Sequence, residues 1–73
     1  MSNQNYVYFE DAYVLDATPQ ALKVAIKGFG MWFPRSQLHD DCELEHVGNE
    51  GDLIIPAWLA EKKEIEPDGE YEP

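Results

Sequence analysis

The sequence predicts a mainly β domain: a small, antiparallel, half-open barrel of four or five strands with a short C-terminal helix. Three observations support this class. Short runs rich in β-branched and aromatic residues recur along the chain. One of them alternates apolar and polar residues with a period of two. Glycine and proline separate the runs, as turn residues do. With 73 residues, the chain is expected to form one domain with a small core.

The first half of the chain is expected to supply three strands. Residues 6–15 are rich in strand formers, and Glu10-Asp11 interrupts them, so we expect one bent strand or two short ones. Residues 16–20 form a turn around Pro19. The next strand covers residues 21–27 and turns Leu22, Val24 and Ile26 to the core. A helix remains the alternative there, because Ala, Leu and Lys also favour helices.

Glycines mark the expected turns in the segment that follows. Residues 28–30, Gly-Phe-Gly, predict a hairpin turn, and residues 31–33 the returning strand, which Pro34 ends. Residues 42–47 alternate again, with Cys42 and Leu44 inward and Glu43 and Glu45 outward. A turn at 48–52 and a strand at 53–55 follow.

The C-terminal part divides into a helix and a tail. Pro56 suits the first turn of a short helix over residues 57–63, whose Trp58 and Leu59 are expected to cover the open end of the core. From Glu64 onward, acids alternate with prolines and a glycine, which leaves no face to bury. The expected organisation is therefore a domain over residues 1–65 and an acidic, flexible tail over residues 66–73.

Charge limits the classes of partner. Fifteen Asp and Glu residues face five Lys and Arg residues, which gives a formal net charge of −10. Such a chain repels nucleic acid and anionic membranes and favours a basic partner. Cys42 is the only cysteine, no run approaches the roughly 18 apolar residues of a membrane span, and the N-terminus lacks signal-peptide features. The expected location is cytoplasmic, in the cytosol of a host bacterium.

Two motifs carry a resemblance. Residues 32–36, Trp-Phe-Pro-Arg-Ser, follow a glycine-bearing turn, and residues 55–60 read Ile-Pro-Ala-Trp-Leu-Ala. Over about residues 12–65 the chain resembles small acidic proteins of bacteriophages and other mobile elements that share these segments. The resemblance implies a compact β-rich protein of phage or plasmid origin. Small acidic phage proteins include inhibitors of host defence, such as anti-CRISPR and anti-restriction proteins.

Eight carboxylates are the candidate partner-binding residues. Glu43 and Glu45 lie two residues apart on a predicted strand, which spans about 6.8 Å, close to the spacing of successive phosphates along a nucleic-acid strand. Other acids flank them in sequence or lie in the N-terminal segment. The full set is Asp40, Asp41, Glu43, Glu45, Glu50, Asp52, Glu10 and Asp11. A solvated surface that only keeps the protein soluble is the alternative interpretation.

The sequence offers only weak candidates for metal binding and for thiol catalysis. His39, Cys42 and His46 have ligand-like spacing, but structural zinc sites usually offer paired cysteines, so no metal and no cofactor is expected. A nucleophilic Cys42 would need an open cleft, whereas the strand pattern buries its side chain. We therefore expect a protein that is not an enzyme.

Two functions remain open at this stage. The first is a phage-type, non-enzymatic inhibitor that binds a basic nucleic-acid-binding host protein, such as a CRISPR effector or a restriction enzyme, through a nucleic-acid-mimicking face. The second is a small SH3-like interaction module that binds a basic or proline-rich peptide, because the chain has more aromatic residues than its core needs. Those aromatics also leave a homodimer open.

Overall fold

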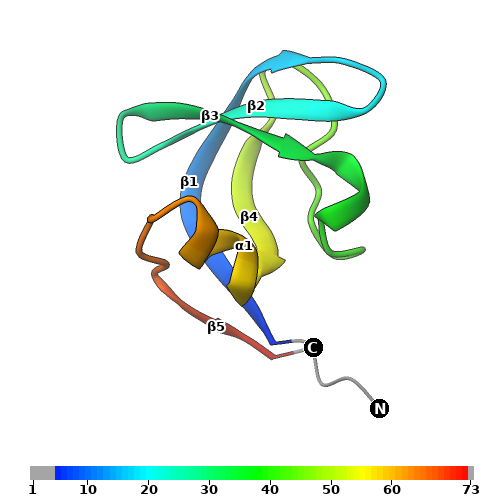
Figure 1. Cartoon of the computed structure of the whole chain (residues 1–73). Coiled ribbons are helices and arrows are strands. Elements are labelled where there is room, and N and C mark those ends of the chain that lie inside the picture. The colour runs from blue at the N-terminus through cyan, green and yellow to red at the C-terminus, as the bar shows by residue number, and fades with distance from the viewer. Residues whose placement is uncertain (1–4, 73) are drawn as a thin grey trace.

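Five strands and one short helix make up the fold of the computed structural model, which describes residues 5–72 (Figure 1). The sheet is open and antiparallel, with the order β3-β2-β1-β4, and β5 pairs with β1. The mainly β class is therefore confirmed. The elements are β1 (Tyr6–Ala17), β2 (Ala21–Ile26), β3 (Phe29–Pro34), the 3-10 turn η1 (Arg35–Gln37), β4 (Glu50–Pro56), α1 (Ala57–Lys62) and β5 (Gly69–Tyr71).

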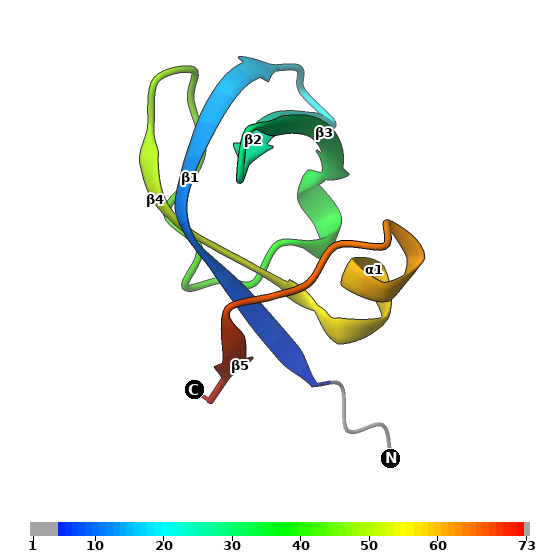
Figure 2. The same ribbon diagram turned by 90° about the vertical axis from the view of Figure 1, so that its left-hand side faces the viewer.

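Strand β1 organises the sheet. Its first eight residues pair with β4, while β2 and β5 pair with different stretches of β1, at residues 13–17 and 6–8. The register with β4 shifts between Phe9 and Ala12, where Asp11 has a φ of 59°. The strand curves through this region and wraps the sheet around the core (Figure 2). The interruption at Glu10-Asp11 is thus a bulge within one bent strand.

Strands β2 and β3 form a tight hairpin. Leu22, Val24 and Ile26 are all buried, so the period-two interpretation is confirmed and the helix alternative is wrong. The turn itself lies one residue earlier than expected. Lys27 and Gly28 have φ values of 52° and 88°, as in a type I′ turn, whose twist matches that of the strands it joins. Phe29 and Gly30 consequently belong to β3, opposite Ile26 and Ala25.

The segment over residues 38–49, here named the long loop, replaces a predicted strand. Residues 42–47 contain no strand, although Leu44 is buried and Glu43 and Glu45 are exposed, as expected. The Asn49 side-chain oxygen accepts the N–H groups of Glu45 and His46 at 2.9 and 2.8 Å. The Asn49 side chain therefore accepts two backbone N–H groups that would be available to a neighbouring strand if residues 42–47 were a strand.

The bounds of β4 correct a second expectation. The strand begins at Glu50, so residues 50–52 are not part of a turn. They pair with β1 through Gly51 and Glu50, opposite Ala12 and Tyr13. Glu50 and Asp52 are therefore strand residues with fixed orientation.

The C-terminal segment differs most from its prediction. Residues 69–71 form β5 on the edge of β1, so the prediction of a flexible tail over residues 66–73 is wrong for these residues. Residue 73 lies outside the described residues. Gly69 permits the pairing, because a Cβ at this position would lie within 3.0 Å of the Tyr8 ring and hydroxyl. Acidic composition suggested disorder, but Gly69 and Tyr71 in the ladder and the contacts of Asp68 dock the segment.

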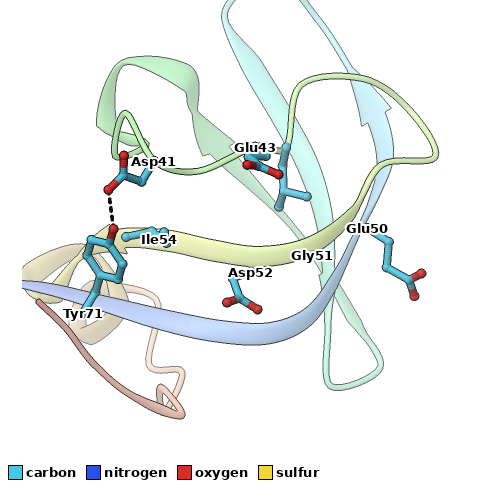
Figure 3. Close-up of a pocket in the computed structure, with 8 residues that line it drawn as sticks. Asp41, Glu43, Glu50, Gly51, Asp52, Ile54 and Tyr71 are labelled. Atoms are coloured by element: carbon cyan, nitrogen blue, oxygen red, sulfur yellow. Dashed lines mark hydrogen bonds between the residues drawn. The ribbon is translucent and has the colours of Figure 1, made fainter. Parts of the chain in front are cut away.

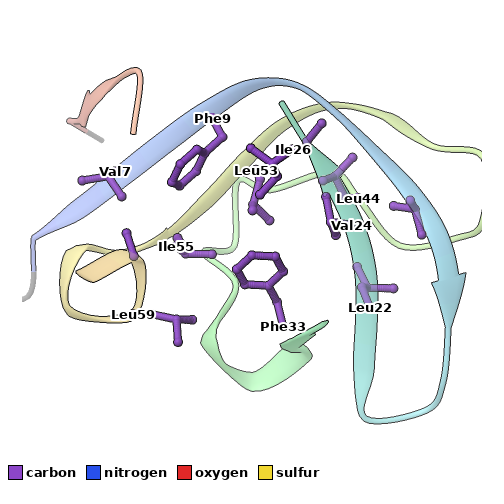
Figure 4. Close-up of a cluster of buried hydrophobic side chains, with 13 residues drawn as sticks. Val7, Phe9, Leu22, Val24, Ile26, Phe33, Leu44, Leu53, Ile55 and Leu59 are labelled. Atoms are coloured by element: carbon purple, nitrogen blue, oxygen red, sulfur yellow. The ribbon is translucent and has the colours of Figure 1, made fainter. Parts of the chain in front are cut away.

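The core lies between the concave face of the sheet and α1 (Figure 4). Leu59 and Ala60 of α1 are buried against it, whereas Trp58 is 46% exposed. The prediction that Leu59 covers the core is therefore confirmed, and the same prediction for Trp58 is wrong. The largest fully buried side chains are Phe9, Phe33, Leu22, Ile26, Leu53, Ile55, Val14, Val24 and Pro56. Among residues 5–72, no helix is long and apolar enough to cross a membrane.

A candidate acidic binding site

A hollow of about 300 Å³ opens between β4, the long loop and β5 (Figure 3). Four carboxylates border it. Asp41 and Glu43 come from the long loop, and Glu50 and Asp52 come from β4. The remaining lining residues are Leu44, Gly51, Ile54 and Tyr71. We name this set the acidic hollow.

Strand β4 presents its acids by simple alternation. Leu53 and Ile55 turn inward and are fully buried, so Asp52 and Ile54 point to the opposite face. Glu50 and Asp52 are exposed there, while Ile54 is only 4% exposed beside them. The same strand therefore supplies apolar residues to the core, two carboxylates to the hollow and an aliphatic contact at its end.

The long loop holds its two acids through backbone contacts. The N–H of His39 donates to the Ile54 carbonyl at 3.0 Å, which fastens the loop to β4. The N–H of Cys42 donates to the His39 carbonyl at 2.9 Å, and the Cys42 thiol lies 3.7 Å from the Asp52 carbonyl. Leu44, at 2% exposure, anchors the loop in the core. Asp41 and Glu43 are thus positioned by an irregular segment that is tied down on both sides.

Tyr71 closes one side of the hollow. Its hydroxyl donates a hydrogen bond to the Asp41 carboxylate (Figure 3). The His39 ring packs edge-on between Tyr6 and Tyr71, with centroid distances of 4.6 and 5.0 Å. The hydrogen bond to Asp41 raises the pKa of Tyr71 above its ordinary value of 10.0, and partial burial and the charge of Asp41 act in the same direction. Sequence reasoning missed this residue because it placed Tyr71 in a flexible tail. An aromatic residue between two acids, Glu70 and Glu72, was the sequence feature that could have indicated a docked segment.

The eight predicted acids separate into groups. Asp41, Glu43, Glu50 and Asp52 come together in the acidic hollow. Asp40 and Glu45 are exposed but do not line it. Glu10 and Asp11 instead border a second depression, together with Lys27, Gly28 and Asp68.

In the second depression, one of the three carboxylates, that of Asp68, has a lysine partner. Lys27 Nζ lies 3.4 Å from the Asp68 carboxylate and 3.1 Å from the Glu66 carbonyl. Asp68 also accepts the N–H of Glu10 at 2.7 Å. This backbone hydrogen bond lowers the pKa of Asp68, Lys27 contributes in the same sense, and partial burial opposes both. These contacts hold β1 and the segment before β5 together, which gives Asp68 and Lys27 a structural role.

The acidic hollow lacks such compensation. Within residues 5–72, no Lys or Arg nitrogen lies within 4.0 Å of Asp41, Glu43, Glu50 or Asp52. His39, whose Nδ1 accepts the Asp41 N–H at 3.0 Å, is the imidazole next to the site. Four carboxylates around one concavity produce a negative potential that attracts cationic groups. Comparison of the chain with protein-family models, curated proteins and solved structures gave no match.

The residues considered for metal binding and thiol chemistry serve other contacts. His39 packs against Tyr6 and Tyr71, and Cys42 is half-buried beside Asp52. His46 is exposed next to Glu45. In the part of the chain that the structure describes, no three His, Cys, Asp or Glu side chains are grouped as metal ligands.

Proposed function

We propose that this protein is a phage-type, non-enzymatic inhibitor that binds a basic nucleic-acid-binding protein of its host through the acidic hollow. A CRISPR effector or a restriction enzyme is the class of target that fits. The observation that carries the proposal is the meeting of Asp41, Glu43, Glu50 and Asp52 in one concavity without a Lys or Arg partner among residues 5–72. By occupying the nucleic-acid site, the protein would block substrate entry without any covalent step.

Strand geometry supports the mimicry. Glu50 and Asp52 lie two residues apart on β4, so their Cα atoms are about 6.8 Å apart along the strand. This spacing is similar to that of successive phosphates on a nucleic-acid strand. It applies to β4 rather than to Glu43 and Glu45, which lie in the long loop. Asp41 and Glu43 add negative charge on the facing side of the hollow.

The net charge of −10 supports rapid recognition. Electrostatic attraction accelerates association with a basic surface and falls steeply as salt is added. The same charge opposes direct binding of nucleic acid and of anionic membranes by the inhibitor itself. Host cytosol is the compartment in which such a target would be met.

A second function is favoured by the apolar part of the hollow. Leu44, Ile54 and Tyr71 line it beside the carboxylates. A lysine or arginine side chain has an aliphatic stem and a charged end, so a basic peptide would match both surfaces. In that case the protein is an interaction module for a peptide rather than a competitor of nucleic acid.

One experiment tests the proposal and separates the two functions. The immobilised chain is used to capture proteins from a bacterial host lysate, and mass spectrometry identifies them. The purified target is then tested for competition between this chain and its nucleic acid over a salt series. An inhibitor of the proposed type competes and loses affinity steeply with salt. Capture of a target that binds the chain and its nucleic acid simultaneously would overturn mimicry and favour the peptide module.

A further inference from the structure

Charge is segregated along the chain in a way that the acidic hollow does not explain. Residues 21–39 contain three of the five Lys and Arg residues and none of the 15 Asp and Glu residues. This acid-free segment comprises β2, β3 and η1. The other strands all carry acids: Glu10, Asp11 and Asp16 in β1, Glu50 and Asp52 in β4, and Glu70 in β5.

Strand β3 ends the sheet on this side. It pairs with β2 along six residues and has no second strand neighbour within residues 5–72. Its sequence, Phe-Gly-Met-Trp-Phe-Pro, contains no charged residue. Phe29 is 68% exposed and Trp32 is 41% exposed. Soluble proteins usually protect such an edge with charges or bulges, because its free N–H and C=O groups can pair with another chain. Here Pro34 protects only the end of the strand.

The cations near β3 are mostly engaged within the molecule. Lys27 contacts Asp68 and the Glu66 carbonyl. Arg35 donates to the carbonyls of Thr18 and Glu45 at 2.8 and 3.2 Å. Lys23 lies directly opposite Trp32 in the β2–β3 register and opposite Asp16 in the β1–β2 register. Residues 21–39 therefore keep a positive charge, because bonds to carbonyls do not neutralise Arg35 and, among residues 5–72, Lys27 is the one of the three with a carboxylate contact. An acidic chain can approach β3 without meeting like charge.

We infer that β3 is the interface with a second copy of this chain. Two copies would pair their β3 edges antiparallel about a two-fold axis, and their sheets would become continuous. Electrostatics selects this edge, because two molecules of charge −10 that meet elsewhere bring Asp and Glu residues together. At β3 they meet through strands that themselves carry no acid. Phe29 and Trp32 supply apolar surface on either side of the new ladder.

This inference does not depend on the proposed function. Strands β3 and β4 occupy opposite ends of the strand order, and the acidic hollow lies on β4. A dimer through β3 uses none of the residues that line the acidic hollow. The purified chain alone is sufficient for the test, so its outcome is separate from the search for a host target.

Sedimentation equilibrium over about 10 µM to about 1 mM protein is the direct measurement. We expect the apparent mass to rise from the monomer value of 8.4 kDa toward twice that value. Added salt should strengthen the dimer, because it screens the repulsion between the acidic copies. A mass of 8.4 kDa at every concentration and salt level would overturn the inference.

Two matched variants locate the interface. Trp32→Glu introduces an acid into β3 and should weaken the dimer by at least about tenfold. Trp58→Glu makes the same change at a residue of similar exposure on α1, 46% against 41%, and should leave the dimer intact. Equal dissociation constants for both variants and the parent would overturn the assignment to β3.

Amide hydrogen exchange on the unmodified protein gives a second readout that does not depend on the folding of any variant. The β3 amides should become more protected as protein concentration rises. Concentration-dependent protection confined to β4, β5 or α1 would contradict the proposed interface. Should circular dichroism show that Trp32→Glu is unfolded, Phe29→Glu replaces it at the more exposed end of the strand and carries the same expectation.

Discussion

Tyr71 links the C-terminal strand to the acidic hollow through one hydroxyl. That hydroxyl donates to Asp41, and the ring packs on His39, whose N–H holds the long loop to β4. The donor exists only while the phenol is protonated, and ionisation would place a second negative charge against Asp41. The contribution of this contact to stability is therefore complete below pH 10.0, the ordinary pKa, and is lost as pH rises through the higher pKa of the folded state.

Alkaline titration of tyrosine absorbance tests this arrangement. The difference between the curves of the parent and of Tyr71→Phe isolates one phenol, and its midpoint should lie above 10.0. In an Asp41→Asn background the same difference should move down toward 10.0, because the charged acceptor is gone. A midpoint that is unchanged by Asp41→Asn would show that the carboxylate does not hold the hydroxyl in solution.

Aromatic residues in this protein differ sharply in what they contribute. Phe33 is fully buried, with Lys63 Nζ 5.3 Å from its ring centroid, whereas Trp32 and Trp58 are more than two-fifths exposed. Phe33→Ala should cost about 3–5 kcal/mol of unfolding free energy, comparable with the whole stability of a small domain. Trp58→Ala should cost about 1 kcal/mol or less, because much of its side chain is already in water. Urea unfolding of both variants measures the contrast, and similar losses would place Trp58 in the core.

At the scale of elements, β5 shows how a polar segment becomes ordered. The N–H of Asp68 donates to the Tyr8 carbonyl at 3.0 Å, and the Asp68 carboxylate accepts the Glu10 N–H. These two bonds use backbone groups of β1 next to the point at which its register with β4 shifts. The segment is therefore hydrogen-bonded to β1 and forms part of the domain.

Removal of residues 66–73 should lower the melting temperature by several degrees. The deletion exposes one edge of β1 and removes the contacts of Asp68 and Tyr71. For a domain of this size, each kcal/mol corresponds to about 4–8 °C. Gly69→Val in the intact chain should act in the same direction, because its side chain would meet the Tyr8 ring. An unchanged melting temperature in both proteins would show that β5 is not docked.

The carboxylate of Asp68 should make this docking dependent on pH. Its pKa is lowered from 3.8 by the Glu10 N–H and by Lys27, so it stabilises the folded state above pH 3.8. The stabilisation is lost as pH falls through the lower pKa of the folded state. Asp68→Asn should therefore melt below the parent at pH 7, and the difference should shrink in strong acid. Glu70→Gln, which removes the same charge from an exposed residue of β5, should show a smaller difference at pH 7.

Local periodicity predicted the elements that pack on the core. The alternation of Leu22, Val24 and Ile26 defined β2, because one face of that strand is buried. The same reasoning placed Cys42–Val47 on a strand, but burial of Leu44 alone does not require a partner strand. Strand β5 could not be predicted from local pattern, since its partner is about sixty residues away and its fit depends on Gly69 against Tyr8.

The candidate site was predictable in composition but not in geometry. The acids of residues 40–52 were evident, yet only tertiary structure shows that Asp41, Glu43, Glu50 and Asp52 share one hollow. The separate position of Glu10 and Asp11 follows from the bulge in β1 and the docking of Asp68. Tyr71 lines the hollow because β5 pairs with β1, a contact between distant parts of the sequence.

At the scale of the whole molecule, charge is distributed unequally over the sheet. The acidic hollow lies on β4, at one end of the strand order, and the acid-free segment includes β3 at the other. We infer that this separation allows a strongly acidic chain to meet a basic host protein on one side and a copy of itself on the other. Neither association would bring the carboxylates of two acidic surfaces together.

Charge reversal in the hollow tests the central claim most directly. The affinity of the captured host protein is measured by calorimetry for Glu43→Lys/Asp52→Lys and for Glu61→Lys/Glu64→Lys, which changes net charge equally at exposed residues outside the hollow. Thermal melting of both proteins confirms that each is folded. We predict that the hollow variant loses a few kcal/mol of binding free energy and the control much less. Equal losses would mean that only net charge matters, and no loss in either would leave the acidic hollow without a role in binding.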